Sequence, residues 1–220
     1  MTSPPPPVTR TASWPARLLG GAAVAVLDRL PVPLPLARVL MLVENAVENA
    51  RGGWDRLHDA GEADRYRAVR AAIERHAPDG FVLDLGCSQG ILREGLAYGR
   101  YVGVDRYAPA LERARGADAS HASPDAAFVA ADVSTFVPDA APDAVVLNEV
   151  LYYLPHPVRV VERYAGLLAP GGVLVGSCYA RTWPTRRLLD RLRRRLDVLE
   201  SVRVVARPHA WEVAVLQPRR

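Results

Sequence analysis

A glycine-containing stretch, VLDLGCSQG over residues 82–90, has the residue types and spacing of a ligand-binding loop. Its apolar run ends in two glycines separated by small or polar residues, a pattern typical of backbone that must approach a ligand closely. Asp105 closes the next apolar run about twenty residues later, where an acidic side chain can bind ribose hydroxyls. The loop, the spacing and the acid together predict a site for a nucleotide-like ligand.

The elements that must position this site follow from an alternation of apolar and helical stretches beyond Pro78. Apolar runs without internal alternation predict strands buried on both faces, and their alternation with helices predicts an α/β fold with a parallel sheet. The expected strands are 81–86, 101–105, 126–132, 143–148 and 172–178, and the expected helices are 62–76, 90–98, 109–114, 157–168 and 184–196. In such sheets ligands bind at the carboxyl ends of the strands, so the loop and the helix expected after Gly90 belong to the site.

The end of the chain differs from this alternation. Residues 202–217 contain two β-branched runs separated only by Pro208 and His209, which is too short for a crossover helix. These runs are therefore expected to pair antiparallel at or near the edge of the sheet.

The composition sets broader limits. With 220 residues, 50% of them hydrophobic, the chain can bury one substantial core, which favours a single catalytic domain. The formal charge is +4, but every basic residue is arginine, as in a compositional bias. The basic run 185–195 carries leucines at helical spacing and predicts a solvated helix face, with nucleic-acid or anionic-lipid contact as the alternative.

Three regions are expected. Residues 1–13 are rich in proline and predict a disordered tail, residues 14–77 predict an N-terminal helical cap, and residues 78–220 predict the ligand-binding domain. The apolar stretches of the cap contain Asp28, Arg29 and several prolines, so stable membrane insertion is not expected. Interfacial attachment is the alternative.

Cysteine and histidine usage is sparse. Cys87 and Cys178 are the only cysteines and fall in predicted buried segments, which indicates a reduced, cytoplasmic compartment. The five histidines are scattered without ligand spacing, so no metal site is expected.

A family resemblance rests on five segments taken together. DLGCSQG over residues 84–90 resembles the first motif, D-x-G-x-G-x-G, of class I S-adenosylmethionine-dependent methyltransferases more than the dinucleotide fingerprint G-x-G-x-x-G. VGVD, AADV, NEVLYYL and LLAPGGVLVGS follow in the family's order. The resemblance covers about Trp54 to Leu216 and implies a Rossmann-like, mostly parallel seven-stranded sheet with an antiparallel last strand. Ser88 departs from the pattern, because it stands where the middle glycine is usual.

The resemblance also implies the residues that hold S-adenosylmethionine. Backbone of the loop would contact its methionine end, Asp105 would bind the ribose diol with Arg106 flanking the adenine, and Asp132 would accept from the adenine amino group. Tyr66, on a lid formed by residues 54–66, would reach the methionine carboxylate. The cofactor-binding residues expected are Tyr66, Asp84, Gly86, Cys87, Ser88, Gly90, Asp105, Arg106, Asp132, Val133 and Asn148. An ordinary turn is the alternative for Asp132, and a loop cap is the alternative for Asp84.

Methyl transfer is an in-line displacement, so orienting the acceptor supplies most of the acceleration, roughly 7 to 11 kcal/mol in favourable cases. A hydroxyl acceptor also needs a base. The catalytic candidates are Glu149, Tyr152, Tyr153 and His156. Each has a plain structural alternative: Glu149 could cap a turn, the tyrosines could cover the pocket, and His156 could lie on the surface.

The sequence therefore predicts a methyltransferase acting on an oxygen or nitrogen of a small molecule. NEVLYYL and the run before the first strand look like a subgroup from bacterial glycan and natural-product clusters, which favours a sugar or secondary metabolite. No nucleic-acid partner is expected, and the chain is expected to be a monomer or homodimer. An NAD-dependent oxidoreductase and a non-catalytic S-adenosylmethionine-binding protein are the alternatives.

Overall fold

A computed structural model describes residues 39, 43, 60–119, 125–180, 183–207 and 209–219 of the chain. The predicted tail lies outside the described residues, as does the predicted cap up to residue 59 apart from residues 39 and 43. The boundaries expected for the tail and the cap therefore remain predictions.

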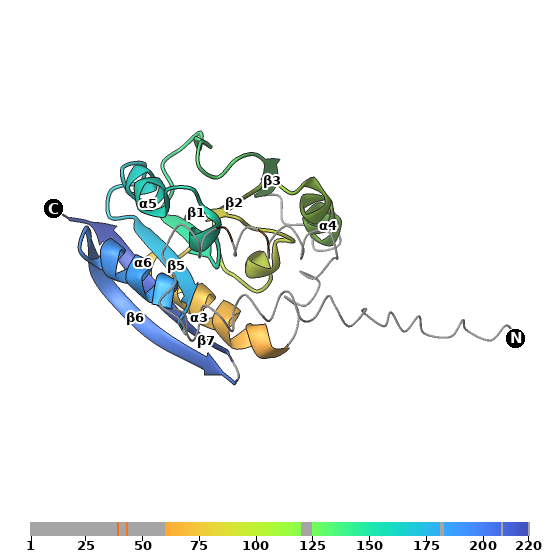
Figure 1. Cartoon of the computed structure of the whole chain (residues 1–220). Helices are drawn as coiled ribbons and strands as arrows, with labels where there is room; N and C mark the ends of the chain where they lie inside the picture. The colour runs from red at the N-terminus through yellow and green to blue at the C-terminus, as the bar shows by residue number, and fades with distance from the viewer. Residues whose placement is uncertain are drawn as a thin grey trace, which may run out of the picture.

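The centre of the fold is one seven-stranded sheet (Figure 1). Its order is β3-β2-β1-β4-β5-β7-β6, and the first five strands in this order are parallel to one another. The strands are β1 (Phe81–Leu85), β2 (Arg100–Asp105), β3 (Ala126–Ala130), β4 (Ala144–Asn148), β5 (Val173–Tyr179), β6 (Leu196–Ala206) and β7 (His209–Pro218). The last strand, β7, is antiparallel to β5 and β6, and the long β6–β7 pair closes one edge. This confirms the predicted mostly parallel sheet with an antiparallel last strand.

Helices cover both faces of the sheet (Figure 1). α5 (Pro157–Ala165) and α6 (Trp183–Arg193) bury their apolar side chains in one core cluster with Leu83 and Leu85 of β1. α3 (Ala60–His76) and α4 (Ala108–Ala119) contribute to a second cluster, which contains Val82. Because consecutive residues of a strand point to opposite faces, a strand buried on both faces must be apolar throughout.

The prediction of a helix over residues 90–98 is wrong. The segment forms only a 3₁₀ turn, η2 (Ile91–Arg93), and a second such turn, η3 (Leu151–Tyr153), follows β4. Gly90 and Gly95 on either side of η2 both have left-handed backbone, with φ of +74° and +73°, which an α-helix does not accept. The loop after β1 therefore has no helix N-terminus behind it, and a dipole contribution to anion binding is not available there.

The basic run 185–195, most of which lies in α6, is amphipathic, as its spacing predicts. Leu188, Leu189 and Leu192 are buried, whereas Arg191 and Arg194 are exposed. Across the described part of the chain, every helix is too short or too polar to cross a bilayer.

Candidate active site

A cavity of about 340 Å³ opens at the carboxyl ends of β1, β2 and β4. β1 and β4 are neighbours in the sheet, and the chain runs from β1 towards β3 on one side and from β4 towards β5 on the other. This is the point of reversed strand order at which open α/β sheets bind ligands. The cavity is lined by Arg65, Tyr66, Asp84, Gly86, Cys87, Ser88, Leu92, Asp105, Arg106, Tyr107, Asp132, Val133, Ser134, Asn148, Glu149, Val150, Tyr153, Leu154 and Pro155.

Most of the residues expected at the site lie on this cavity. Of the cofactor-binding set only Gly90 is not among the lining residues, and of the catalytic candidates Glu149 and Tyr153 line it. Tyr152 and His156 do not, and His156 is an exposed residue just before α5. Position on the cavity does not assign a role, so the individual roles remain predictions.

The glycines of the loop are required by the protein's own packing. Gly86 has a φ of +80°, and a Cβ added there would lie 2.6 Å from the Val150 side chain. A Cβ added at Gly90 would lie 2.9 Å from the Phe128 ring. The loop after β1 therefore fits closely against β3 and the loop after β4, which explains both glycines without a ligand.

Ser88 shows why the family's pattern has glycine at this position. Its φ is +49°, in the left-handed region that glycine enters without strain and other residues enter at a cost of about 1–2 kcal/mol. The backbone N–H of Ser88 donates to Asp105 Oδ2 at 2.9 Å. This hydrogen bond contributes to holding the strained residue in place.

Asp105 fixes the ends of two strands. Besides the Ser88 N–H, it accepts the N–H of Tyr107 at Oδ1 over 2.9 Å. A carboxylate offers about four lone-pair positions, so two remain for a ligand in the cavity. Asp105 can therefore hold the loop and bind a diol at the same time.

Asp84 is a buried carboxyl next to the cavity. The Tyr101 hydroxyl donates to its Oδ2 at 2.6 Å. Burial raises the pKa of Asp84 to about 7, a rise that Tyr101 opposes and the nearby Asp105 increases. Asp84 therefore changes charge in the neutral pH range, and a cation in the cavity would favour its ionised form.

Asp132 has both a structural and a potential binding role. Its Oδ1 accepts the N–H of Ser134 at 2.7 Å, which is the ordinary turn that the sequence offers as an alternative. Asp132, Val133 and Arg106 nevertheless all lie on the cavity. The turn holds the Asp132 carboxylate at the cavity wall.

Arg65 is the main site residue that the sequence analysis misses. The residue is 1% exposed, and its guanidinium contacts Glu62 Oε2 through Nε at 3.0 Å and Nη2 at 2.7 Å and lies 4.4 Å from the centre of the Tyr66 ring. Its Nη1 donates to Asn148 Oδ1 at the end of β4. One signal was available: Arg65 falls at helical spacing with the buried Val69 and Ala72, so it belongs to the inward face of α3.

A polar network continues from Asn148 across β4 and β5. The Ser177 hydroxyl lies 2.7 Å from Asn148 Oδ1 and 3.3 Å from Glu149 Oε1, and it accepts the N–H of Glu149 at 3.1 Å. The Tyr152 hydroxyl donates to Glu149 Oε2 at 2.6 Å. Tyr152 therefore contacts Glu149 without lining the cavity, and its ring stacks edge-on against Tyr153 at 4.7 Å.

Glu149 combines backbone strain with an unusual environment. Its φ is +59°, a conformation that non-glycine residues rarely adopt and that is enriched at functional sites. Burial raises the pKa of Glu149, although Arg65 and the Tyr152 hydroxyl favour its ionised form. A carboxyl with a raised pKa at a cavity is suited to exchanging a proton.

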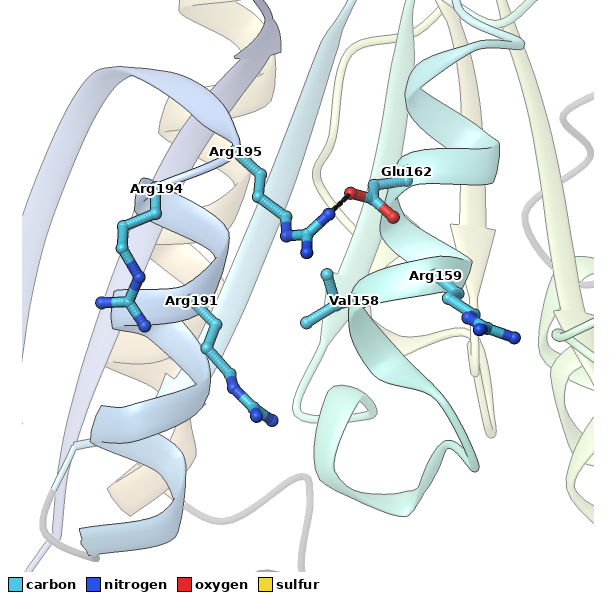
Figure 2. Close-up of a pocket in the computed structure, with 6 residues that line it drawn as sticks. All are labelled: Val158, Arg159, Glu162, Arg191, Arg194 and Arg195. Carbon is cyan, nitrogen blue, oxygen red and sulfur yellow. Dashed lines mark hydrogen bonds and ion pairs between the residues drawn. The ribbon is translucent and has the colours of Figure 1, made fainter.

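A second hollow, of about 500 Å³, lies between α5 and α6 and shares no lining residue with the first (Figure 2). Arg195 reaches across it to Glu162 at 2.6 Å, whereas Arg159 and Arg194 point away (Figure 2). These exposed side chains do not converge on one point, which fits the predicted solvated helix face.

Comparison with known proteins gives a family and a set of relatives. A family model described as a methyltransferase domain matches residues 59–214. The chain is 33% identical over 153 residues to the trans-aconitate 2-methyltransferase of Methylobacterium radiotolerans, covering 67% of this chain and 52% of that protein. It is 36% identical over 114 residues to the trans-aconitate 2-methyltransferase of Variovorax paradoxus, covering 49% and 42%. The chain thus spans about half the length of the curated relatives it matches.

Solved structures share the fold. The N-methyltransferase NodS of Bradyrhizobium japonicum, in complex with S-adenosyl-l-homocysteine, is 25% identical with a TM-score of 0.63, covering 75% of this chain and 91% of that one. The 1,6-didemethyltoxoflavin-N1-methyltransferase of Burkholderia thailandensis is 19% identical with a TM-score of 0.65, covering 87% and 92%. At that lower identity, the likeness shows the fold alone.

Proposed function

The chain belongs to the class I S-adenosylmethionine-dependent methyltransferases, and from this premise we propose that it transfers a methyl group from S-adenosylmethionine to an oxygen or nitrogen of a small molecule. One observation carries the proposal. The cavity at the reversal of strand order is bounded by the glycine loop after β1, Asp105 after β2, Asp132 after β3 and Asn148 at the end of β4. These are the positions at which the family's motifs fall.

The residues present fit such a cofactor. Asp84, Asp105, Asp132 and Glu149 give the cavity four carboxyl groups, and Arg106 and Arg65 are the arginines that line it. Arg65 is already paired with Glu62, so the part of the wall formed by Asp84, Asp105 and Asp132 favours a ligand with positive charge and hydrogen-bond donors. S-adenosylmethionine offers a sulfonium, an amino group and a ribose diol.

The proposed holding residues follow from these contacts. Asp105 would accept the ribose hydroxyls with the lone pairs that Ser88 and Tyr107 leave unused. Asp132 would accept from the adenine amino group while Val133 packs against the ring. Asp84, once ionised, would attract the amino group, and backbone of Gly86, Cys87 and Ser88 would border the methionine end.

When bound, S-adenosylmethionine supplies a methyl group on a cationic sulfur that departs as a neutral thioether. The chain's own contribution would then be to orient the acceptor and exclude water, since orientation is the larger part of such a catalysis. Tyr153, Leu154 and Pro155 would cover the cavity after β4. Glu149 would take the acceptor's proton where the acceptor is a hydroxyl.

The proposal also includes a substrate class, a cellular location and a small-molecule partner. The subgroup resemblance supports a sugar or secondary metabolite of bacterial natural-product biosynthesis, whereas the curated relatives are trans-aconitate 2-methyltransferases. A cytoplasmic location is supported by the two buried, unpaired cysteines. The small-molecule partner is supported by the size of the cavity.

Isothermal titration with S-adenosylmethionine, S-adenosylhomocysteine and NAD tests the proposal. We expect the two sulfur cofactors to bind wild type and to lose at least about tenfold in affinity in Asp105→Ala, because charged hydrogen bonds are worth about 1.5–3 kcal/mol each. Asp139→Ala is the matched control, since Asp139 is an exposed aspartate paired with Arg100 away from the cavity. Binding of NAD alone would support the oxidoreductase alternative. Binding of S-adenosylmethionine by a protein that transfers no methyl group to a broad acceptor panel would favour the non-catalytic alternative.

A further inference from the structure

The amide of Asn148 has one possible orientation. A guanidinium only donates hydrogen bonds, so the Asn148 atom that Arg65 Nη1 contacts must be the oxygen, Oδ1. The Ser177 hydroxyl supports the same assignment. It accepts the Glu149 N–H, and its single proton is directed to the nearer oxygen, Asn148 Oδ1 at 2.7 Å rather than Glu149 Oε1 at 3.3 Å.

Both residues that fix the amide are buried. Arg65 is 1% exposed and Ser177 is fully buried, and they approach from different elements, α3 and β5. Arg65 is itself held by Glu62 and by the Tyr66 ring. The orientation of Asn148 is therefore set by side chains packed behind it.

Because the Asn148 oxygen accepts from Arg65 and Ser177, the NH₂ group of the same amide is left for the cavity. Asn148 lines the cavity, and among the residues that the structure describes no protein oxygen accepts from its nitrogen. Two N–H donors are therefore available to a ligand at the carboxyl end of β4, next to Glu149. They are matched by a ligand with oxygen lone pairs and not by one with N–H groups.

Resting on the proposed function, we propose that Asn148 is a specificity-determining residue whose NH₂ group binds a carboxylate oxygen of the acceptor, with Arg65 and Ser177 as its positioning residues. An amine acceptor needs a lone pair on the protein to orient its N–H groups, but the Asn148 oxygen is already occupied. A carboxylate acceptor needs hydrogen-bond donors, and the two N–H groups of the Asn148 amide supply them.

The reaction for such an acceptor balances without a base. A lone pair of one carboxylate oxygen forms the new O–CH₃ bond while the S–CH₃ bond breaks and its electron pair stays on sulfur. The products are a methyl ester and S-adenosylhomocysteine, and no proton moves. Glu149 lies beside this acceptor and would repel it when ionised. Its raised pKa favours the neutral form, which does not repel a carboxylate.

The test observes the Asn148 amide directly by nitrogen-15 NMR. Its side-chain NH₂ signals are identified by their loss in Asn148→Asp, and the protein is first saturated with S-adenosylhomocysteine. We expect saturable shifts of these signals on titration with sodium acetate and with trans-aconitate, and no such shift with sodium chloride or methylammonium chloride. Absence of a saturable shift with both carboxylates would overturn the proposal.

Asn148→Asp also tests the proposal through the binding affinity for carboxylates. It keeps an oxygen for Arg65 and Ser177 but replaces the donor by a second oxygen, so carboxylate affinity should fall at least about tenfold. The sequence-based prediction that Asn148 holds the cofactor requires an equal loss for S-adenosylhomocysteine, whereas the present proposal requires carboxylate affinity to fall much more than S-adenosylhomocysteine affinity. A parallel loss of S-adenosylhomocysteine affinity would mean that the NH₂ group serves the cofactor, and the proposal would be wrong.

The positioning roles have their own comparison. Ser177→Ala and Arg65→Met should each weaken carboxylate binding several-fold while the protein still binds S-adenosylhomocysteine, and Arg65→Lys should restore part of the loss because lysine can donate one hydrogen bond to Asn148. Equal carboxylate affinity in Arg65→Met and wild type would remove Arg65 from the proposal. Failure of wild type to bind S-adenosylhomocysteine at all would instead contradict the proposed function.

Discussion

The two sides of the cavity are built in different ways. At the ends of β1, β2 and β3, the carboxylates of Asp105 and Asp132 accept N–H groups of nearby backbone, and the loop conformation depends on single glycines. At the end of β4, side chains from three distant segments, Arg65, Asn148 and Ser177, hold one another. The first side is fixed mainly by backbone geometry and short-range turns, and the second by side-chain contacts across the fold.

This difference predicts different responses to mutation. On the first side, substitutions should act through backbone strain and close packing. On the second side, they should act by leaving a buried polar group without its partner.

The largest effect is expected at Gly86. In Gly86→Ala the left-handed backbone costs about 1–2 kcal/mol and the close approach to Val150 about 1–3 more, so the free energy of unfolding should fall by about 2–5 kcal/mol. Denaturant unfolding measures it. Gly95→Ala is the control, because Gly95 has a similar φ of +73° but no atom within 4 Å of an added Cβ. Equal losses in the two variants would show that packing against Val150 contributes nothing.

Arg65→Met should destabilise by about 2–4 kcal/mol, because Glu62 loses its buried partner and the Asn148 oxygen loses one of its two donors while the apolar stem is kept. Arg67→Met is the matched control on the same helix. Arg67 is 75% exposed, and its pair with Asp64 should be worth less than about 1 kcal/mol. Similar unfolding free energies for both variants would contradict a side-chain network at the end of β4.

Asp84 should make stability depend on pH. Since its pKa is about 7 in the fold and near its ordinary acidic value when unfolded, unfolding releases a proton between about pH 4 and pH 7. Over that window the free energy of unfolding of wild type should fall relative to Asp84→Asn by up to about 1.4 kcal/mol per pH unit, and level off above it. Urea unfolding at several pH values measures the difference. Parallel pH profiles of the two proteins would show that Asp84 is ionised throughout.

The smallest effect is expected at Ser88. Ser88→Gly relieves the left-handed strain but adds freedom to the unfolded chain, so the net gain in unfolding free energy should be below about 1 kcal/mol. Ser134→Gly, a serine of the same cavity that lacks a positive φ, should lose stability instead. A loss in Ser88→Gly as large as that in Ser134→Gly would mean that Ser88 is not strained.

The same division explains what could be predicted from the sequence. The strands, their order of alternation and the antiparallel end follow from apolar runs and from the short Pro208–His209 connection. Asp105 follows from its spacing after the glycine loop, whereas Asp132 was indicated by the family resemblance. The helix after Gly90 was predicted wrongly because the pattern did not reveal that Gly90 and Gly95 both have left-handed backbone. Arg65 and Ser177 escaped because their partner, Asn148, lies 83 and 29 residues away in sequence, and local spacing carries no signal for such contacts.

The most direct test of this account is a crystal structure of the protein with S-adenosylhomocysteine. We predict the ribose diol on Asp105, the adenine amino group at Asp132, and an Asn148 amide that makes no hydrogen bond to the cofactor and faces the space left for an acceptor. A cofactor bound elsewhere, or one whose carboxylate takes the Asn148 NH₂ group, would contradict the division of the cavity into a cofactor side and an acceptor side.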